Sequence, residues 1–146
     1  MQTGRYRAAV SSIWLAGLIL IIAGCATHAP APQEDVRADR AARQWLALVD
    51  RGTYERSWQQ ASAMFRNGID QGAWIEAVGN ARADTGAPSK RKLVSIAYTR
   101  KLPGVRDNDY VVLVYASRFD DRPPIQETVT LVREDGELKT AGYFLR

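Results

Sequence analysis

The stretch Tyr110-Val-Val-Leu-Val-Tyr-Ala-Ser-Arg-Phe119 decides the fold, because it is the most β-prone run in the chain. Its apolar side chains fall on both faces of the expected strand: Val111, Leu113, Tyr115 and Phe119 on one, and Tyr110, Val112, Val114 and Ala116 on the other. A strand that is apolar on both faces is central in its sheet and at least partly covered on both sides. The sequence therefore predicts a sheet built around residues 110–119.

Three more segments have the period of two that is typical of strands. Residues 93–100 come first, with Val94, Ile96 and Tyr98 expected on one face. Residues 125–133 alternate apolar and polar side chains, and Asp135-Gly136 is a strong hairpin turn leading into residues 138–145. The sequence therefore predicts four antiparallel strands.

Before the strands, between about residues 34 and 86, apolar residues recur at spacings of three and four. Gly52 is expected to end a first helix, and Thr53 to cap a second helix that runs to Asn67-Gly68. Asp70 is expected to cap a third helix, which finishes by Gly86. Each expected helix carries one tryptophan that we interpret as a core anchor: Trp45, Trp58 and Trp74. The predicted class is α+β, with three N-terminal helices packed on one face of a curved four-stranded antiparallel sheet.

Composition narrows the possible functions. A chain of 146 residues that is 46% hydrophobic and 25% charged suits one globular domain. The net charge of +4 includes Arg5 and Arg7, which lie in a first segment without acids. Without these two, 18 basic residues face 16 acidic ones, so we expect no nucleic-acid partner.

Residues 1–24 have the pattern of a bacterial signal peptide. The two arginines precede an apolar run, residues 8–24, that is short for a membrane-spanning helix. The run ends in Ile22-Ala-Gly-Cys25, which resembles the lipobox of bacterial lipoproteins. The resemblance implies cleavage before Cys25 and acylation of its sulfur and new amino group, which gives a stable membrane anchor. An ordinary secretory signal and a short N-terminal membrane helix are the alternatives.

Residues 25–37 are then a lipidated cysteine with an Ala/Pro-rich tether, and residues 38–146 the domain. Ala26 follows the cysteine, and by the sorting pattern of such lipoproteins this favours the outer membrane, facing the periplasm. We expect no function for His28, which lies in the tether without a fixed neighbour.

The domain lacks the side chains of common catalytic sites. Beyond the tether it has no Cys and no His, which excludes thiol nucleophiles, Ser-His-acid triads and His-based zinc sites. It has no P-loop or dinucleotide fingerprint either. We therefore expect no catalytic residue, metal or cofactor.

Carboxylates are the chemistry that remains. Asp120 and Asp121 are expected to be solvated in a loop. Glu127 shares a strand face with apolar residues, so it needs a donor, for which we expect a strand arginine such as Arg100 or Arg118. An ion pair at the edge of the core is favoured over a catalytic acid.

Two surface features complete the set. Lys90-Arg91-Lys92 with Arg100-Lys101 could form a basic patch at one end of the sheet, suited to phosphate headgroups or an anionic cell-wall polymer; a solvated face is the alternative. Val112 and Val114 lie on the second face of the central strand. If no helix covers that face, it is a small-ligand concavity or a protein interface.

The domain resembles the bacterial domain-of-unknown-function 4019 family over about residues 38–146. The resemblance is carried by Trp45-Leu-Ala-Leu-Val-Asp50, Gly52-Thr-Tyr54, Ser57-Trp-Gln-Gln-Ala61, Phe65, Trp74, Leu102-Pro-Gly104, Tyr110-Val-Val112, Glu127-Thr-Val-Thr130, Asp135-Gly136 and Gly142-Tyr-Phe144. The family's layout is similar to cone-shaped folds of the nuclear-transport-factor-2-like or cystatin-like type. It has no established activity, so the resemblance implies a fold and no reaction.

Three functions follow from these observations. The favoured one is a non-enzymatic envelope lipoprotein that binds an envelope protein or a second copy. Its candidate surface is the open sheet face or a mouth beside Trp58, Tyr98 and Tyr115, with Glu127 as a further candidate residue. The second is a small-ligand carrier or enzyme with an apolar cone and Glu127 or Asp120 as its polar group. The third is a spacer or scaffold.

Overall fold

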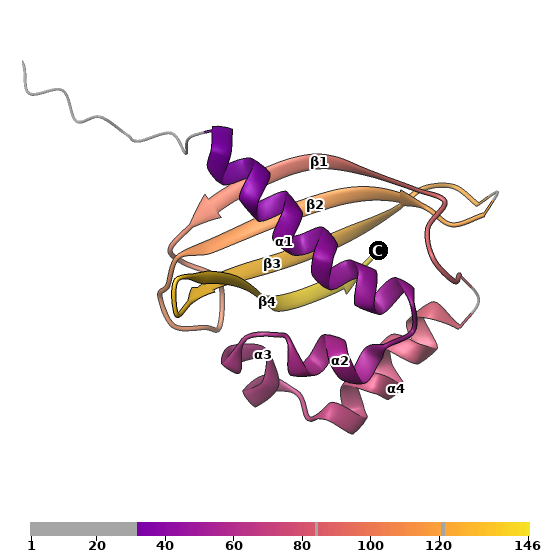
Figure 1. Cartoon of the computed structure of the whole chain (residues 1–146), viewed down its shortest axis with the longest axis horizontal. Helices are drawn as coiled ribbons and strands as arrows, with labels where there is room; N and C mark the ends of the chain where they lie inside the picture. The colour runs from indigo at the N-terminus through magenta and orange to yellow at the C-terminus, as the bar shows by residue number, and fades with distance from the viewer. Residues whose placement is uncertain (1–31, 84, 121) are drawn as a thin grey trace, which may run out of the picture.

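The computed structural model describes residues 32–83, 85–120 and 122–146, so the predicted signal peptide, Cys25 and His28 lie outside the described residues. Helices precede strands, as expected. The helices are α1 (Pro32–Asp50), α2 (Tyr54–Gln59), α3 (Ala63–Gly68) and α4 (Gln71–Arg82); the strands are β1 (Lys90–Thr99), β2 (Tyr110–Arg118), β3 (Ile125–Glu134) and β4 (Glu137–Leu145). Helix α1 crosses the sheet diagonally, and α2 to α4 lie beyond the β4 edge (Figure 1). The predicted α+β class is confirmed.

The expected second helix is two helices, which corrects the predicted number. The chain breaks at Ser62, whose backbone is extended and whose hydroxyl accepts a hydrogen bond from the Phe65 amide at 3.2 Å. The Ser62 amide in turn donates to the Thr140 carbonyl of β4 at 2.9 Å, so the break is tied to the sheet edge. Capping of a helix by a serine hydroxyl restarts the helix in a new direction.

The two other expected caps differ in outcome. Asp70 caps α4 as predicted, because its carboxylate accepts from the Ala73 amide at 2.9 Å. Thr53 does not cap α2; its hydroxyl donates to the Leu48 carbonyl at 2.8 Å and holds the end of α1 instead.

Helix α1 begins within the segment assigned to the tether. Pro32 opens the helix, where its fixed φ and missing amide hydrogen are tolerated. Glu34 and Asp35 follow in the first turn, where carboxylates interact favourably with the helix dipole. Residues 32–37 are therefore helical and belong to the folded unit.

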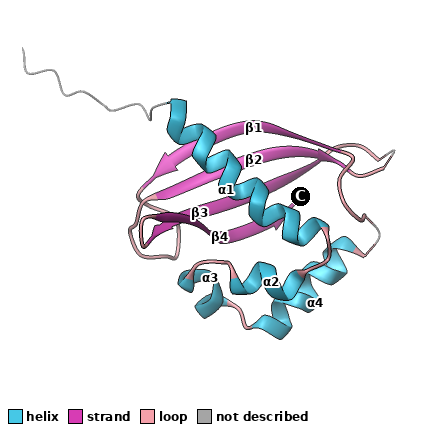
Figure 2. Ribbon diagram, viewed as in Figure 1, coloured by secondary structure: helices cyan, strands magenta, loops and turns pink. Residues whose placement is uncertain are grey.

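The sheet is antiparallel in the order β1-β2-β3-β4, so β2 is internal as predicted (Figure 2). The β3–β4 connection is the predicted hairpin turn, with Asp135 at φ 53° and Gly136 at φ 82°, as a two-residue turn requires. Strand β1 differs from the expectation at Val94. A β-bulge between Leu93 and Ser95 turns Val94 outwards, where it is 62% exposed, while Leu93 takes its place against the core.

Aromatic side chains fill the space between the helices and the sheet. Trp45 lies 5.8 Å from Trp74 and 5.6 Å from Tyr143 between ring centres, and Phe65 packs edge-on against Trp74 at 5.0 Å. Both tryptophan indole groups donate to Ser57, Trp45 to its carbonyl and Trp74 to its hydroxyl. Trp45 and Trp74 are thus the core anchors that their spacing predicted.

Candidate functional site

Glu127 lies in β3 with its carboxylate pointing into the helix side of the sheet, and it is fully buried. Arg82 Nη2 donates to its Oε1 at 2.8 Å, and the Tyr143 hydroxyl donates to the same oxygen at 2.7 Å. Its Oε2 accepts from Arg91 Nε at 2.6 Å and from the Ser117 hydroxyl. Both oxygens of this buried carboxylate therefore accept hydrogen bonds from the chain itself, which leaves no free acceptor for a second molecule.

Asp50 brings a second carboxylate to the same two arginines. Arg91 donates to both of its oxygens, at 2.7 and 2.9 Å, and Arg82 Nη2 lies 3.2 Å from Oδ1. We call Asp50, Arg82, Arg91 and Glu127 the buried charge cluster. Its four side chains come from α1, α4, β1 and β3, and two positive charges balance two negative ones.

The environment of the cluster fixes its protonation. Burial alone would raise the pKa of Glu127, but the hydrogen bond and positive charge of Arg91, with hydrogen bonds from Ser117 and Tyr143, hold that pKa below its ordinary value. Burial and the negative charge of Glu127 raise the pKa of Tyr143. Near neutral pH the carboxylate is ionised and the phenol is a donor, which is the arrangement of a structural network and not of a general acid.

The predicted ion pair of Glu127 is confirmed, and one partner, Arg91 of β1, is a strand arginine as expected, but the two arginines named as examples were wrong. The Arg100 side chain is 80% exposed and lies 3.5 Å from Asp109. Arg118 is paired in register with Lys90 and is exposed, while the neighbouring pair Arg91 and Ser117 faces the helices. Side chains alternate between the two faces of a strand, so Arg118 cannot reach the face on which Glu127 lies.

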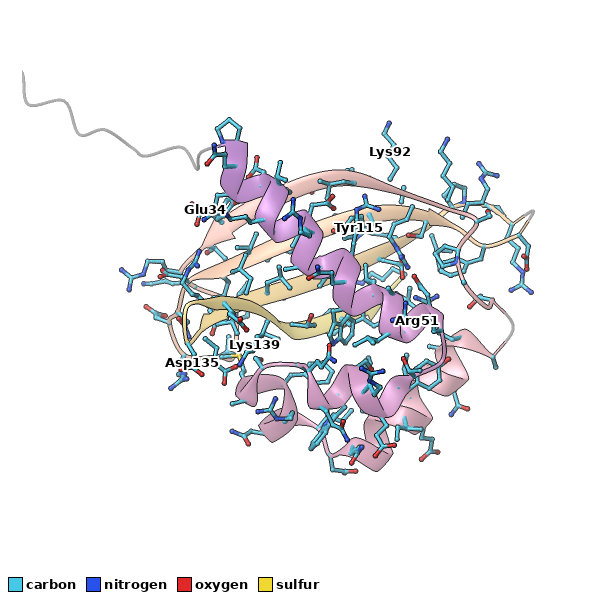
Figure 3. The ribbon with its side chains drawn as sticks, viewed as in Figure 1. Glu34, Arg51, Lys92, Tyr115, Asp135 and Lys139 are labelled. Atoms are coloured by element: carbon cyan, nitrogen blue, oxygen red, sulfur yellow. The ribbon has the colours of Figure 1, made fainter. Side chains whose placement is uncertain are left out.

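Two predicted residues, Tyr98 of β1 and Tyr115 of β2, are bound to α1, and Tyr115 lies beneath that helix (Figure 3). The Tyr98 hydroxyl donates to Asp35 and the Tyr115 hydroxyl to Asp39, each at 2.8 Å. Burial and the hydrogen-bonded carboxylate raise the pKa of both phenols. Tyr115 has no exposed surface, and both hydroxyls are used to hold α1 on the sheet.

The third residue of the expected mouth, Trp58, belongs to the helical layer. Its indole nitrogen donates to the Ile69 carbonyl at 2.8 Å, which joins α2 to the start of the α4 segment. The structure therefore ties Tyr98 and Tyr115 to α1 and places Trp58 in a separate set of contacts.

Polar clefts run along the helix side between α1 and the β3–β4 hairpin. One has a volume of about 350 Å³ and the next about 320 Å³, and both are bordered by Ala41, Gln44, Glu137 and Leu138. Within the described residues no group of three or more acidic, His or Cys side chains is arranged to hold a metal ion. Asp120 is exposed in the β2–β3 loop, as expected.

The opposite face of the sheet, which we call the outer face, is covered at one end only. There the β1–β2 loop and Met64 cover Tyr110, whose hydroxyl donates to the Arg106 carbonyl at 2.7 Å. Further along the face Val112 and Val114 are half-buried, and Phe144 is 61% exposed. An apolar cleft of about 270 Å³ lies at the boundary, lined by Met64, Leu102, Pro103, Val105, Tyr110, Thr130, Ala141, Gly142 and Phe144. The central strand is thus covered on both faces only in part, as predicted.

The expected basic patch is divided in the structure. Lys90 and Lys92 lie at the start of β1, whereas Arg100 and Lys101 follow its end, about 30 Å away for a strand of this length. Arg91 points inwards to the buried charge cluster. Lys92 points away from the helices (Figure 3), and Lys90 with Arg118 shares its face. The outer face therefore has its own basic corner, formed by Lys90, Lys92 and Arg118.

The sequence did not mark Asp50, Arg82, Arg91, Ser117 and Tyr143 as members of the inner network. The need of Glu127 for donors was visible from its apolar neighbours, but nothing in the local pattern showed that a donor would come from the end of a helix. Arg82 is the last residue of α4, and a helix carrying one apolar stripe gives no reason to turn its final arginine inwards.

No helix among the described residues is long and apolar enough to cross a membrane. The fold and its inner network define a small α+β domain in which α1 crosses one face of a four-stranded antiparallel sheet and α2 to α4 lie beyond its β4 edge. The family model for the protein of unknown function DUF4019 matches residues 41–143, and the chain belongs to this family. Comparison with curated proteins finds no match.

Proposed function

We propose that this protein is a non-enzymatic lipoprotein of the bacterial envelope, held by an acylated Cys25 in the outer membrane and facing the periplasm. Its domain acts by binding, through the outer face of the sheet. The leader sequence, the lipobox-like Ile22-Ala-Gly-Cys25 and the small, Pro-containing segment that follows support the anchor.

The observation that carries the binding role is the contrast between the two faces of the sheet. On the helix face the aromatic core and α1 fill the space over the sheet, and the clefts beside the β3–β4 hairpin are polar. On the outer face Val94 of β1 is 62% exposed near half-buried Val112 and Val114 of β2. Phe144 of β4 is 61% exposed, and Thr128 and Thr130 of β3 lie between it and the two valines. Large apolar side chains left exposed on one face of a domain are typical of a surface that binds another molecule.

The inner network supports a non-catalytic role. Glu127 is the carboxylate with the best-built environment, yet its oxygens are saturated by Arg82, Arg91, Ser117 and Tyr143. The space that an apolar cone would offer to a ligand holds Trp45, Trp74 and other core aromatics. These contacts argue against the small-ligand or enzymatic alternative.

Crosslinking in cells tests the binding role. A photo-crosslinking amino acid replaces Phe144 of the outer face in the full chain, and in a matched variant it replaces Ile75 of α4, an aliphatic residue that is 38% exposed. We expect a specific adduct from position 144 and none from position 75. Equal yields at the two positions, or no adduct to protein or lipid at position 144, would contradict binding through the outer face.

A further inference from the structure

We propose that the outer face binds an anionic lipid bilayer, so that the domain lies with its sheet against the membrane and its helices turned away. This inference rests on the proposed function and names the surface that the outer face contacts. Three independent features of the described residues lead to it: exposed apolar side chains, cations beside them, and the position at which the anchor segment enters the fold.

Exposed apolar side chains are concentrated on this side of the molecule. Five large hydrophobic residues are exposed in the described chain, and three of them, Val94, Val105 and Phe144, lie on the outer face or in the loop that borders it. Val105 belongs to the segment Leu102-Pro-Gly-Val105 at the tip of the β1–β2 loop. A short apolar loop beside an aromatic side chain is suited to the headgroup region of a bilayer.

Cations flank the apolar surface on two sides. Lys101 and Arg106 enclose the loop tip in sequence, and the basic corner of Lys90, Lys92 and Arg118 lies at the other end of the face. Two of the acids nearby are engaged: Asp109 lies 3.5 Å from Arg100, and the Glu134 carboxylate accepts from the Ala63 amide of α3 at 3.0 Å. Asp107, Asp135 and Glu137 are exposed acids close to the loop and the hairpin, and Asp120 is exposed two residues after Arg118.

This charge pattern favours a bilayer over a second copy as the occupant. Two copies meeting face to face would each add a cationic, apolar surface to the interface. Anionic headgroups neutralise the cations while the acyl region accepts the apolar side chains. Each cation beside an anionic surface strengthens partitioning about fivefold.

The anchor segment enters the fold at the loop end of the sheet. The first turn of α1 is fixed there by Asp35 to Tyr98, at the end of β1, and by Glu34 to Arg133, at the end of β3, each at 2.8 Å. Cys25 precedes Pro32 by seven residues, which span at most about 25 Å when extended. A bilayer that holds Cys25 is therefore close enough for the outer face to lie on it.

A fluorescent label tests this orientation. Phe144→Cys and, as the matched control, Ile75→Cys are introduced separately into the full chain, purified with the native N-terminus and labelled with a polarity-sensitive dye. An acylated Cys25 has no free thiol, so the dye reports only the new position. The proteins are reconstituted in vesicles of phosphatidylcholine and phosphatidylglycerol at two to one, and in vesicles of phosphatidylcholine alone.

We expect a blue shift of the dye at position 144, and not at position 75, that is much larger in the anionic vesicles. The substitutions Lys90→Gln, Lys92→Gln and Arg118→Gln together should weaken docking about 100-fold. The same loss of charge on exposed arginines of the helix layer, Arg37→Gln, Arg40→Gln and Arg51→Gln, should leave the shift unchanged.

Three results would overturn the inference. They are a dye at position 144 that stays in water, an equal shift in both kinds of vesicle, and a shift that depends on protein concentration without vesicles, which would identify a second copy as the occupant. The intact mass of the same preparation reports the acyl chains separately. Acyl chains with a silent dye would refute bilayer docking alone. Absent acyl chains would refute the anchor; docking is then read in the same variants with Cys25→Ser added, in which the dye again reports only the new position.

Discussion

Arg82, the last residue of α4, and Glu127, near the start of β3, form an ion pair of 2.8 Å although 45 positions separate them in sequence. Their side chains are 2% and 0% exposed, so the pair is withdrawn from water. Arg91 and Asp50 complete the buried charge cluster, which joins the ends of two helices to two strands. The cluster therefore fixes the position of α1 and α4 relative to the sheet. It has a structural role, and the proposed binding surface is the outer face.

The Arg82→Met variant should lose about 3–5 kcal/mol of the free energy of unfolding, because it leaves buried carboxylates without one of their two cations. Urea unfolding followed by tryptophan fluorescence measures the loss. The control is Arg100→Gln, which removes an exposed arginine and should change little. A loss no larger than that of the control would mean that the cluster contributes nothing to stability.

As the pH falls, the free energy of unfolding should decrease more steeply for the native protein than for a Glu127→Gln variant. The folded-state pKa of Glu127 is below its ordinary value, so the unfolded chain binds a proton first. The stabilisation from this group is complete above its ordinary pKa of about 4.5 and is lost as the pH falls through its folded-state pKa. Urea midpoints measured between pH 7 and pH 3 give the slope. Parallel slopes for the two proteins would contradict the lowered pKa.

Alkaline titration should separate the buried tyrosines from the rest. Burial raises the pKa of Tyr98, Tyr115 and Tyr143, so these phenols stay protonated in the folded chain at a pH where free tyrosine is half ionised. Their contribution to stability is complete below about pH 10 and is lost as the pH rises further. Absorbance at the tyrosinate band should rise later in native protein than in urea-unfolded protein. Coincident curves would show that the hydroxyls are accessible.

Replacing the helix caps should be moderately destabilising. Ser62→Ala and Asp70→Ala each remove an acceptor for an amide in the first turn of a helix, at a cost of about 1 kcal/mol. Thermal unfolding detects this loss, with Ser95→Ala at an exposed strand position as the control. If Ser62→Ala matches the control, the break between α2 and α3 does not depend on the cap.

The sequence predicted the elements whose pattern is local. The apolar run at 110–119, the Asp135-Gly136 turn and the Asp70 cap all lie where expected, because strand alternation, turn chemistry and capping are properties of a few neighbouring residues. The break at Ser62 was missed because its amide is satisfied by Thr140 of β4, a partner remote in sequence. The bulge at Val94 was missed for the same reason, since it arises from the register with β2.

For the candidate site, too, the sequence predicted the local features and not the contacts between remote residues. Burial of Glu127 followed from the face it shares with Val129, and with burial came the need for a cation. The identity of the cation that pairs with Glu127 depends on how α4 and β1 pack at that face. In the sequence, nothing distinguishes Arg82 and Arg91 from arginines that are exposed to solvent. The exposure of Phe144 likewise depends on the placement of the helices, which leave this part of the outer face uncovered.

The intact mass of the protein extracted from membranes in mild detergent tests the central claim most directly. An envelope lipoprotein should have the mass of residues 25–146 plus the acyl chains on the sulfur and amino group of Cys25. The mass of the unprocessed chain, or of any product in which the Cys25 thiol is free, would contradict it.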